Sequence, residues 1–414
     1  MNFKSRAARL KLPIADQAVV SGSNFLVGIL LVRALGVEGY GVYVLLWSIT
    51  QFMQACATAL LNAPMATIGP AQGGSEADTY YGSVGTLTLL WALFTGGLVL
   101  LIGSVSTALP AWWRAEYAVP LACWQATAQV QEFARRVAYA RGAHVRVLAI
   151  DAVGYLPQIA VAAIFASAGV VPAIWWISSC LGASAAFAWF TEVRFPFDAA
   201  QAFSTIRRHW ISSRWLLGAA WLQWISSNLL ILGAASTMGA VIAGAIRATQ
   251  NIFGFVNIAF NVVESVTPAA ASRRMAAGGV RALGAFVVSR AVLLAVITLA
   301  CGLILALGSR EILTIFYGAA GPEATHAAIW FVPIYTLTAV GLVLRIGLRT
   351  MERTRAIFVG YVASTCASIA TTHWLQTQLE PNIHFVLAAL LLTQLVALSP
   401  VMMGFRQLIK RGEG

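Results

Sequence analysis

Predominantly apolar runs recur from one end of this 414-residue chain to the other. A run of about 20 such residues forms a helix long enough to cross about 30 Å of hydrocarbon, and within a bilayer the backbone polar groups must be satisfied by the segment itself or by a closed barrel. Charged residues make up only 10% of the chain, against about 25% in soluble domains. The longest polar break, about residues 192–213, is too short for a soluble domain. The sequence therefore predicts one all-α integral membrane protein.

The apolar runs predict about twelve transmembrane helices. We expect them at residues 14–35, 41–63, 83–109, 117–138, 147–168, 171–191, 212–234, 239–263, 285–307, 327–348, 355–377 and 383–405. Lys and Arg gather at the N-terminus, in the loops after spans four, six, eight and ten, and in the C-terminal tail. Cytoplasmic loops carry such an excess, so we expect a multi-pass protein of the bacterial inner membrane with both termini in the cytoplasm. The first span is too long for a cleaved signal peptide and should remain as a signal anchor.

Several chemistries are disfavoured by the residue pattern. The basic residues that give the net charge of +12 lie in the short loops between spans, where they set the orientation of the protein. Nucleic acid is therefore not an expected partner. The five cysteines and five histidines show no metal-ligand spacing, and we expect no metal or other cofactor. The chain has no GxxxxGK[ST] loop for ATP and no Ser/His/Asp arrangement. We therefore expect a secondary transporter and not an enzyme.

Residues 34–41 and 237–244 form a weak internal repeat. Each segment ends a span that carries an Asn, Asn24 in the first and Asn228 in the seventh, and each leads through a tight turn into another span. Chance similarity is the alternative explanation. A true repeat predicts two six-helix bundles, residues 1–198 and 199–414, related by a pseudo-two-fold axis. Repeats of this kind place the substrate in a central cavity near the bilayer midplane.

A stripe of polar residues lies in the apolar eighth span. At the 100° rotation of a helix these residues share one face, and they are Arg247, Gln250, Asn251, Asn261 and Ser265, with Gly254 among them. A charge inside a span costs about 2.5–3.5 kcal/mol on insertion scales, so it marks a functional site by default. Arg247 either forms a buried structural ion pair or binds an anion, and its fixed guanidinium suits a phosphate. The chain is thus expected to move a polar molecule across the bilayer.

Other polar residues in spans are candidates of lower specificity. Asp16 either pairs with Arg214 or Lys11 at the interface or is a protonatable carboxylate that couples transport to an ion. Arg33 either snorkels to the nearby surface or lines the mouth of the cavity. Asn228 lies among neutral polar groups that can simply join helices.

Two further sets of charged residues lie near the cytoplasmic ends of spans. Glu264 is a second tentative ion-coupling residue and is expected opposite Arg345 or Arg290. Another set, Glu132, Arg135 and Asp151, is expected to form an ion-pair cluster that fixes helix packing.

Three segments carry a resemblance to a known family. Residues 25–36 with 39–43, residues 135–142 and residues 244–251 resemble, in that order, the first hairpin, the loop after span four and the start of span eight of Wzx-type polysaccharide flippases. These flippases belong to the multidrug/oligosaccharidyl-lipid/polysaccharide exporter (MOP) superfamily. The twelve-span, two-half plan extends the resemblance over the whole chain.

The resemblance implies a substrate and a mechanism. The substrate is an undecaprenyl-pyrophosphate-linked oligosaccharide of exopolysaccharide or O-antigen biosynthesis, turned from the cytoplasmic to the outer leaflet by alternating access driven by H⁺ or Na⁺. Membrane lipid, a polysaccharide polymerase and other assembly proteins are expected partners. The family's cationic cavity maps onto Arg247 and, less closely, Arg33. Twelve spans with few midplane arginines depart from the related lipid II flippases, which have fourteen spans.

Two other functions are compatible with the sequence. A drug or cation antiporter of the same superfamily would need a carboxylate deep in the cavity, whereas the acids here lie towards span ends. A membrane-embedded polysaccharide polymerase or ligase would need reactive side chains in a large outer loop, and the longest one, about residues 308–326, offers few.

Overall fold

A computed structural model describes residues 3–69, 74–105, 109–192, 199–317, 322–351, 353–378 and 382–411. Within these ranges the chain is helical and contains no strand. The early helices are α1 (Phe3–Ala57), a π-helical turn (Thr58–Asn62), α2 (Ala63–Ile68), α3 (Gly74–Val105), α4 (Ala118–Ala140), α5 (His144–Phe165) and α6 (Val170–Glu192). They are followed by α7 (Ala199–Met238), α8 (Ala240–Ile252), α9 (Gly254–Leu307), α10 (Ser309–Tyr317), α11 (Pro322–Thr350), α12 (Arg355–Gln376) and α13 (Ile383–Arg411).

Eight helices in the described part of the chain are long and apolar enough to cross a membrane. Two long helices hold more than one segment, because α1 turns at Gly36 and α9 turns at Gly278 and Gly279. Helices α4 and α12, and α8 with the start of α9, add further segments of spanning length. The backbone contacts divide the chain into two compact units, Met1–Trp221 and Leu222–Gly414. The prediction of an all-α membrane protein built from two helix bundles is confirmed.

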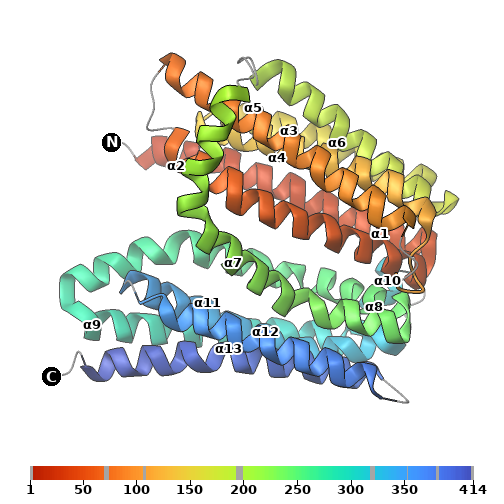
Figure 1. Cartoon of the computed structure of the whole chain (residues 1–414). Coiled ribbons are helices and arrows are strands. Elements are labelled where there is room, and N and C mark those ends of the chain that lie inside the picture. The colour runs from red at the N-terminus through yellow and green to blue at the C-terminus, as the bar shows by residue number, and fades with distance from the viewer. Residues whose placement is uncertain are drawn as a thin grey trace. The chain divides into compact units, whose positions relative to one another are not determined.

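The first unit is a bundle in which α4 packs against α3 and α6, while α5 packs against α1 and α6 (Figure 1). Its buried core includes Met65, Val84, Phe133 and Ile150. Helices α5 and α6 approach closely at Gly154, where a Cβ atom would lie 3.0 Å from the side chain of Ser184. The hydroxyl of Ser184 donates to the carbonyl of Ile150 at 2.6 Å. These contacts hold α5 and α6 in a fixed register.

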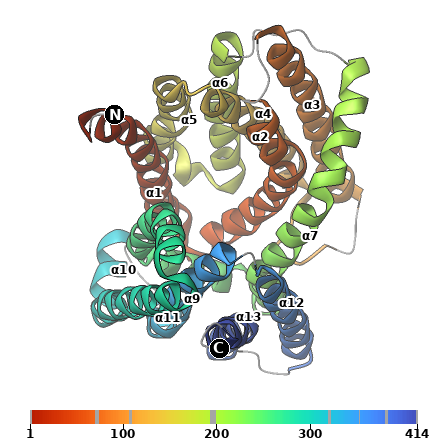
Figure 2. The same ribbon diagram turned by 90° about the vertical axis from the view of Figure 1, so that its left-hand side faces the viewer.

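The second unit is organised around α11, which packs against α8, α9 and α13 (Figures 1 and 2). Phe253, Phe331 and Ile246 are among its most deeply buried side chains. The hydroxyl of Thr249 in α8 donates to the carbonyl of Ala324 in α11 at 2.9 Å. The face of α8 that is opposite its polar stripe is therefore anchored in the core of this unit.

Several expected loops are helical in the structure. The turn expected over residues 36–40 is confined to Gly36, with φ 70° and ψ 175°, and helix continues on both sides. Most of the polar segment 192–213 belongs to α7, which begins at Ala199, and α9 continues past Arg273. The physical reason is that hydropathy reports where the hydrocarbon ends, whereas a helix ends only where caps or breakers end it.

Candidate functional site

A buried ion-pair cluster in the first unit is centred on Arg135. Its Nε donates to Asp151 Oδ2 at 2.6 Å, its Nη2 to Asp16 Oδ2 at 3.2 Å and its Nη1 to Glu132 Oε2 at 3.2 Å. The side chains of Asp16 and Asp151 are 1% and 0% exposed, and that of Arg135 is 13% exposed. One guanidinium thus joins α1, α4 and α5. The expected cluster of Glu132, Arg135 and Asp151 is confirmed.

Asp16 is a member of the same cluster. Arg214 or Lys11 was expected as its partner, and the side chain of Lys11 lies outside the described residues. The structure supplies Arg135, together with the Tyr139 hydroxyl, which donates to Asp16 Oδ2. Asp16 lies in the first half of α1, and the packing of α1 beside α4 and α5 brings it inward.

Asp16 and Asp151 both bond to the Arg135 guanidinium through their Oδ2 atoms. Oδ1 of Asp16 is buried and has no hydrogen-bond partner in the described part of the chain. An ionised carboxylate oxygen can only accept a hydrogen bond, whereas a protonated carboxyl group can also donate one. The cluster therefore gathers two buried carboxyl groups around one cation.

The polar stripe of the second unit begins on α8. Arg247 is half-buried, and its Nη1 donates to Gln250 Oε1 at 3.2 Å. The charge of Arg247 also acts on Tyr335 of α11. Two of the expected residues, Arg247 and Gln250, are thus in direct contact.

The stripe continues onto α9 on a face turned away from the core of the second unit. Asn251 is half-buried, and Asn257 and Asn261 are exposed. The opposite side packs on an aromatic cluster, in which the rings of Phe253 and Tyr335 have centroids 5.1 Å apart. The side chain of Ser265 lies outside the described residues.

The remaining candidates fall in different places. Asn24 and Arg33 belong to the first unit and are exposed. Asn228 belongs to the second unit, where its Nδ2 donates to the Trp224 carbonyl at 3.0 Å. Glu264 is exposed and interacts electrostatically with Arg345, one of its two expected partners.

Sequence reasoning missed the two tyrosines that complete these sites. Tyr139 follows Arg135 by four residues in α4, a spacing that places both on one helical face. The spacing alone could therefore have predicted a contact between the two side chains. In the structure the Arg135 guanidinium lies over the Tyr139 ring, 5.3 Å from its centroid. Tyr335 comes from α11 and carries no local signal that relates it to Arg247.

The fold is shared with solved structures over almost the whole chain. No protein-family profile and no curated protein matches the sequence. A multidrug resistance MATE family transporter of the MOP superfamily, in an inward-facing conformation, is 17% identical with a TM-score of 0.70, and the match covers 98% of this chain and 99% of that one. The lipid II flippase MurJ is 9% identical with a TM-score of 0.69, and the match covers 98% and 91%.

A third structure is a MOP superfamily transporter from Pyrococcus furiosus Vc1 (DSM3638), described with a reversed polarity of its binding pocket. It is 14% identical with a TM-score of 0.60, and the match covers 98% of this chain and 96% of that one. Identities this low are informative about architecture alone. The chain is a multi-pass membrane protein with the fold of MOP superfamily transporters.

Proposed function

We propose that this protein is an ion-coupled flippase that moves an undecaprenyl-pyrophosphate-linked oligosaccharide from the cytoplasmic to the outer leaflet by alternating access, and that Arg247 binds the diphosphate. The observation that carries the proposal is a half-buried guanidinium on the largely apolar helix α8, next to the neutral amide of Gln250. Guanidinium binds phosphate oxygens bidentately and stays protonated at all physiological pH values. The fold supports lipid movement, since one structure that shares it is a lipid II flippase.

Neutral groups near Arg247 suit the rest of the headgroup. Gln250, Asn251 and Asn261 share its helical face and offer both donors and acceptors to phosphate or sugar oxygens. Asn24, Asn228 and Arg33 are proposed as further substrate-binding residues. The polyprenyl tail stays in the lipid.

The coupling ion is proposed to be a proton carried by Asp16, whose buried Oδ1 has no hydrogen-bond partner in the described part of the chain. Sodium is disfavoured there because the Arg135 guanidinium bonds to both carboxyl groups and would repel a metal cation. Glu264 is a secondary candidate for ion coupling because it is exposed in a charged region.

The proposal is tested by surface-glycan export in cells that depend on this protein. Arg247→Ala is expected to abolish export and to leave lipid-linked glycan on the cytoplasmic leaflet, while the protein remains in the membrane at its normal level. Arg247→Lys should retain part of the activity, because a point charge replaces a bidentate fork. Arg281→Ala, at an exposed arginine of the same unit, is the matched control. Normal export by Arg247→Ala cells would reject the proposed role.

A drug or cation antiporter remains the second candidate, since a multidrug transporter shares the fold. Organic cations need an available carboxylate, and the most buried carboxyls of the described chain, Asp16 and Asp151, are already bonded to Arg135. Loss of the gene would raise susceptibility to cationic drugs if the protein were an antiporter. Unchanged susceptibility together with lost glycan export would favour the flippase.

A further inference from the structure

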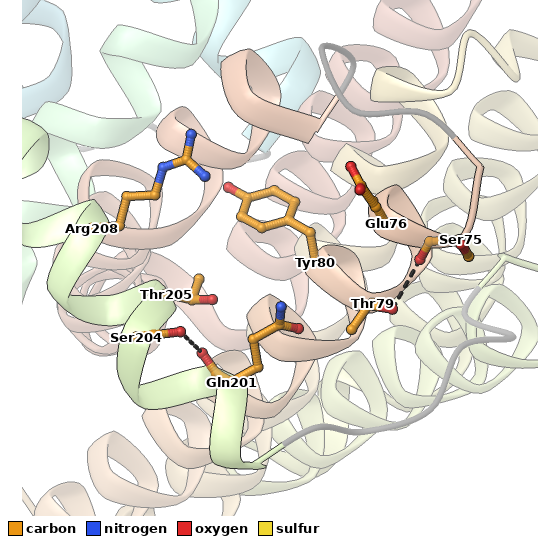
Figure 3. Close-up of a pocket in the computed structure, with 8 residues that line it drawn as sticks. All are labelled: Ser75, Glu76, Thr79, Tyr80, Gln201, Ser204, Thr205 and Arg208. Atoms are coloured by element: carbon orange, nitrogen blue, oxygen red, sulfur yellow. Dashed lines mark hydrogen bonds between the residues drawn. The ribbon is translucent and has the colours of Figure 1, made fainter.

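A polar pocket of about 460 Å³ opens in the first unit between the N-terminal turns of α3 and α7 (Figure 3). This volume lies within the range of about 300–1,000 Å³ that is typical of small-ligand sites. All of its lining residues are polar, and they are Ser75, Glu76, Thr79, Tyr80, Gln201, Ser204, Thr205 and Arg208. Small-ligand pockets are predominantly apolar, whereas about half of the surface of this lining is polar, so the pocket suits a ligand rich in hydrogen-bonding groups.

The two walls of the pocket are joined by buried polar contacts. The hydroxyls of Ser83 and Thr205 are 2.9 Å apart and both residues are buried. The ring of His209, which is 0% exposed, has Nδ1 3.1 Å from the carbonyl of Leu60 and Nε2 2.7 Å from the Tyr80 hydroxyl. Because a carbonyl can only accept, Nδ1 carries the proton and the Tyr80 hydroxyl donates to Nε2. The pocket is therefore preorganised by side chains beneath it.

Opposite charges lie across the pocket. Figure 3 shows the Arg208 guanidinium and the Glu76 carboxylate on either side of the Tyr80 ring, one from α7 and one from α3. Within the described part of the chain, neither side chain forms an ion pair. The two charges cancel, so the lining as a whole favours a neutral ligand over an anion, which Glu76 repels, and over a cation, which Arg208 repels.

A sugar ring fits this set of donors and acceptors. Adjacent hydroxyls of a sugar can both donate to one carboxylate, and their oxygens can accept from a guanidinium and from an amide. The lining supplies each of these groups in Glu76, Arg208 and Gln201, with serine and threonine hydroxyls between them. The hydroxyls of Thr79 and Ser204 donate to backbone carbonyls at 2.9 and 2.8 Å, and their oxygens can still accept from a sugar hydroxyl.

The geometry points to a carbohydrate-binding site in this pocket that holds sugar units of the lipid-linked glycan before translocation, an assignment that rests on the proposed function. The side of the membrane agrees with this role. The two segments of α1 run antiparallel (Figure 1), so α3 begins on the side of the N-terminus. With the N-terminus expected in the cytoplasm, that is the side from which the glycan would be loaded.

The site is tested with the full-length protein in lipid nanodiscs, which avoid the sugar headgroups of maltoside detergents. Saturation-transfer NMR would be recorded with methyl glucoside and N-acetylglucosamine as probes, with inorganic phosphate and choline as comparison compounds. We expect saturation transfer to at least one sugar and at least a tenfold loss of its affinity in both Glu76→Ala and Arg208→Ala. Arg207→Ala, at the neighbouring exposed arginine outside the lining, is the matched control and should bind normally.

Each outcome decides the assignment. Binding of neither sugar, binding that survives in the Glu76→Ala/Arg208→Ala double variant, or phosphate binding lost with Arg208 would overturn it. Glycan export by the same cells separates the two proposals. Normal export by cells lacking the gene would reject the flippase function, and sugar binding could still be measured. Export that depends on the gene, by a protein that binds no sugar, would reject only the sugar-binding site.

Discussion

Gly36 and Gly239 turn the chain with nearly the same backbone conformation, φ 70° and ψ 175° in the first case and φ 88° and ψ 167° in the second. Each residue follows the helix that opens its half of the repeat, and helix resumes at once beyond it. Positive φ is readily available only to glycine. The agreement adds a structural counterpart to the weak sequence repeat of residues 34–41 and 237–244.

Replacing either glycine with alanine is expected to destabilise the protein by about 1–3 kcal/mol, because positive φ with ψ near 170° is a region that is essentially restricted to glycine. Clash with other parts of the described chain makes no contribution, because a Cβ at Gly36 or Gly239 would meet nothing there within 4 Å. Gly22→Ala is the control, since that position also has nothing within 4 Å but lies within regular helix. Free energies of unfolding from denaturant titration would check this. Equal stability of all three variants would contradict the strain.

Neighbouring arginines in α4 are expected to differ sharply in their contribution to stability. Arg135→Ala leaves Asp16 and Asp151 buried without their counter-charge, and breaking such a pair costs about 3–5 kcal/mol. Arg136 is 42% exposed and pairs with Glu132 at 2.6 Å, so its loss should cost under about 1 kcal/mol. Chemical unfolding of the two alanine variants in the same detergent measures the difference. A similar loss in both would show that burial of the cluster is unimportant.

Acid should weaken the attachment of α7 to α3. Burial is the main cause that lowers the pKa of His209 below its ordinary value of about 6.5. The unfolded chain takes up a proton at this site before the folded chain does, so the stabilisation is complete above about pH 6.5 and declines as the pH falls below it towards the folded pKa.

Thermal unfolding between pH 8 and pH 5 checks this dependence. His209→Gln keeps an amide for hydrogen bonding but cannot titrate, and its midpoint should fall less on acidification than that of the wild type. His373→Gln, at an exposed histidine of the second unit, controls for the loss of a histidine elsewhere. Parallel pH curves for wild type and His209→Gln would rule out the effect.

Helices α12 and α13 approach closely at Gly360, where a Cβ atom would lie 2.6 Å from the carbonyl oxygen of Ala397. Backbone cannot yield as a flexible side chain can, so Gly360→Ala should cost about 1–3 kcal/mol, as overpacking usually does. Gly97→Ala in α3, where nothing lies within 4 Å, should cause no loss. Unfolding midpoints of the purified variants provide the measurement, and an undisturbed Gly360→Ala protein would show that the helices can separate at no cost.

Hydropathy was enough to predict the helical class and the approximate spans, because only helices and closed barrels satisfy the hydrogen bonds of the backbone inside a bilayer. Helix ends were predicted poorly, as at Ala199, since polar segments can remain helical outside hydrocarbon. Within the candidate sites, Arg135 and Glu132 could be paired from their spacing in one helix. Asp16 could not be assigned to Arg135, because that contact depends on how α1 packs against its neighbours.

The polar pocket was beyond sequence reasoning for the same reason. Tyr80 and His209 lie in separate helices, and neither has a local pattern that relates it to the other. Arg247 could be singled out from the sequence because a charged residue in an apolar run is unusual. Tyr335 is an ordinary aromatic residue in the sequence, and only the packing of the helices relates it to Arg247.

A turn of one residue at Gly36 has a practical consequence for tagging this protein. Proteases, antibodies and inserted tags need several residues of accessible chain, and this turn has none to offer. In the first unit, on the side opposite the N-terminus, the segment 109–117 presents Arg114 and Glu116 with side chains 70% and 55% exposed. Epitope insertion and surface labelling of that half should therefore be directed there.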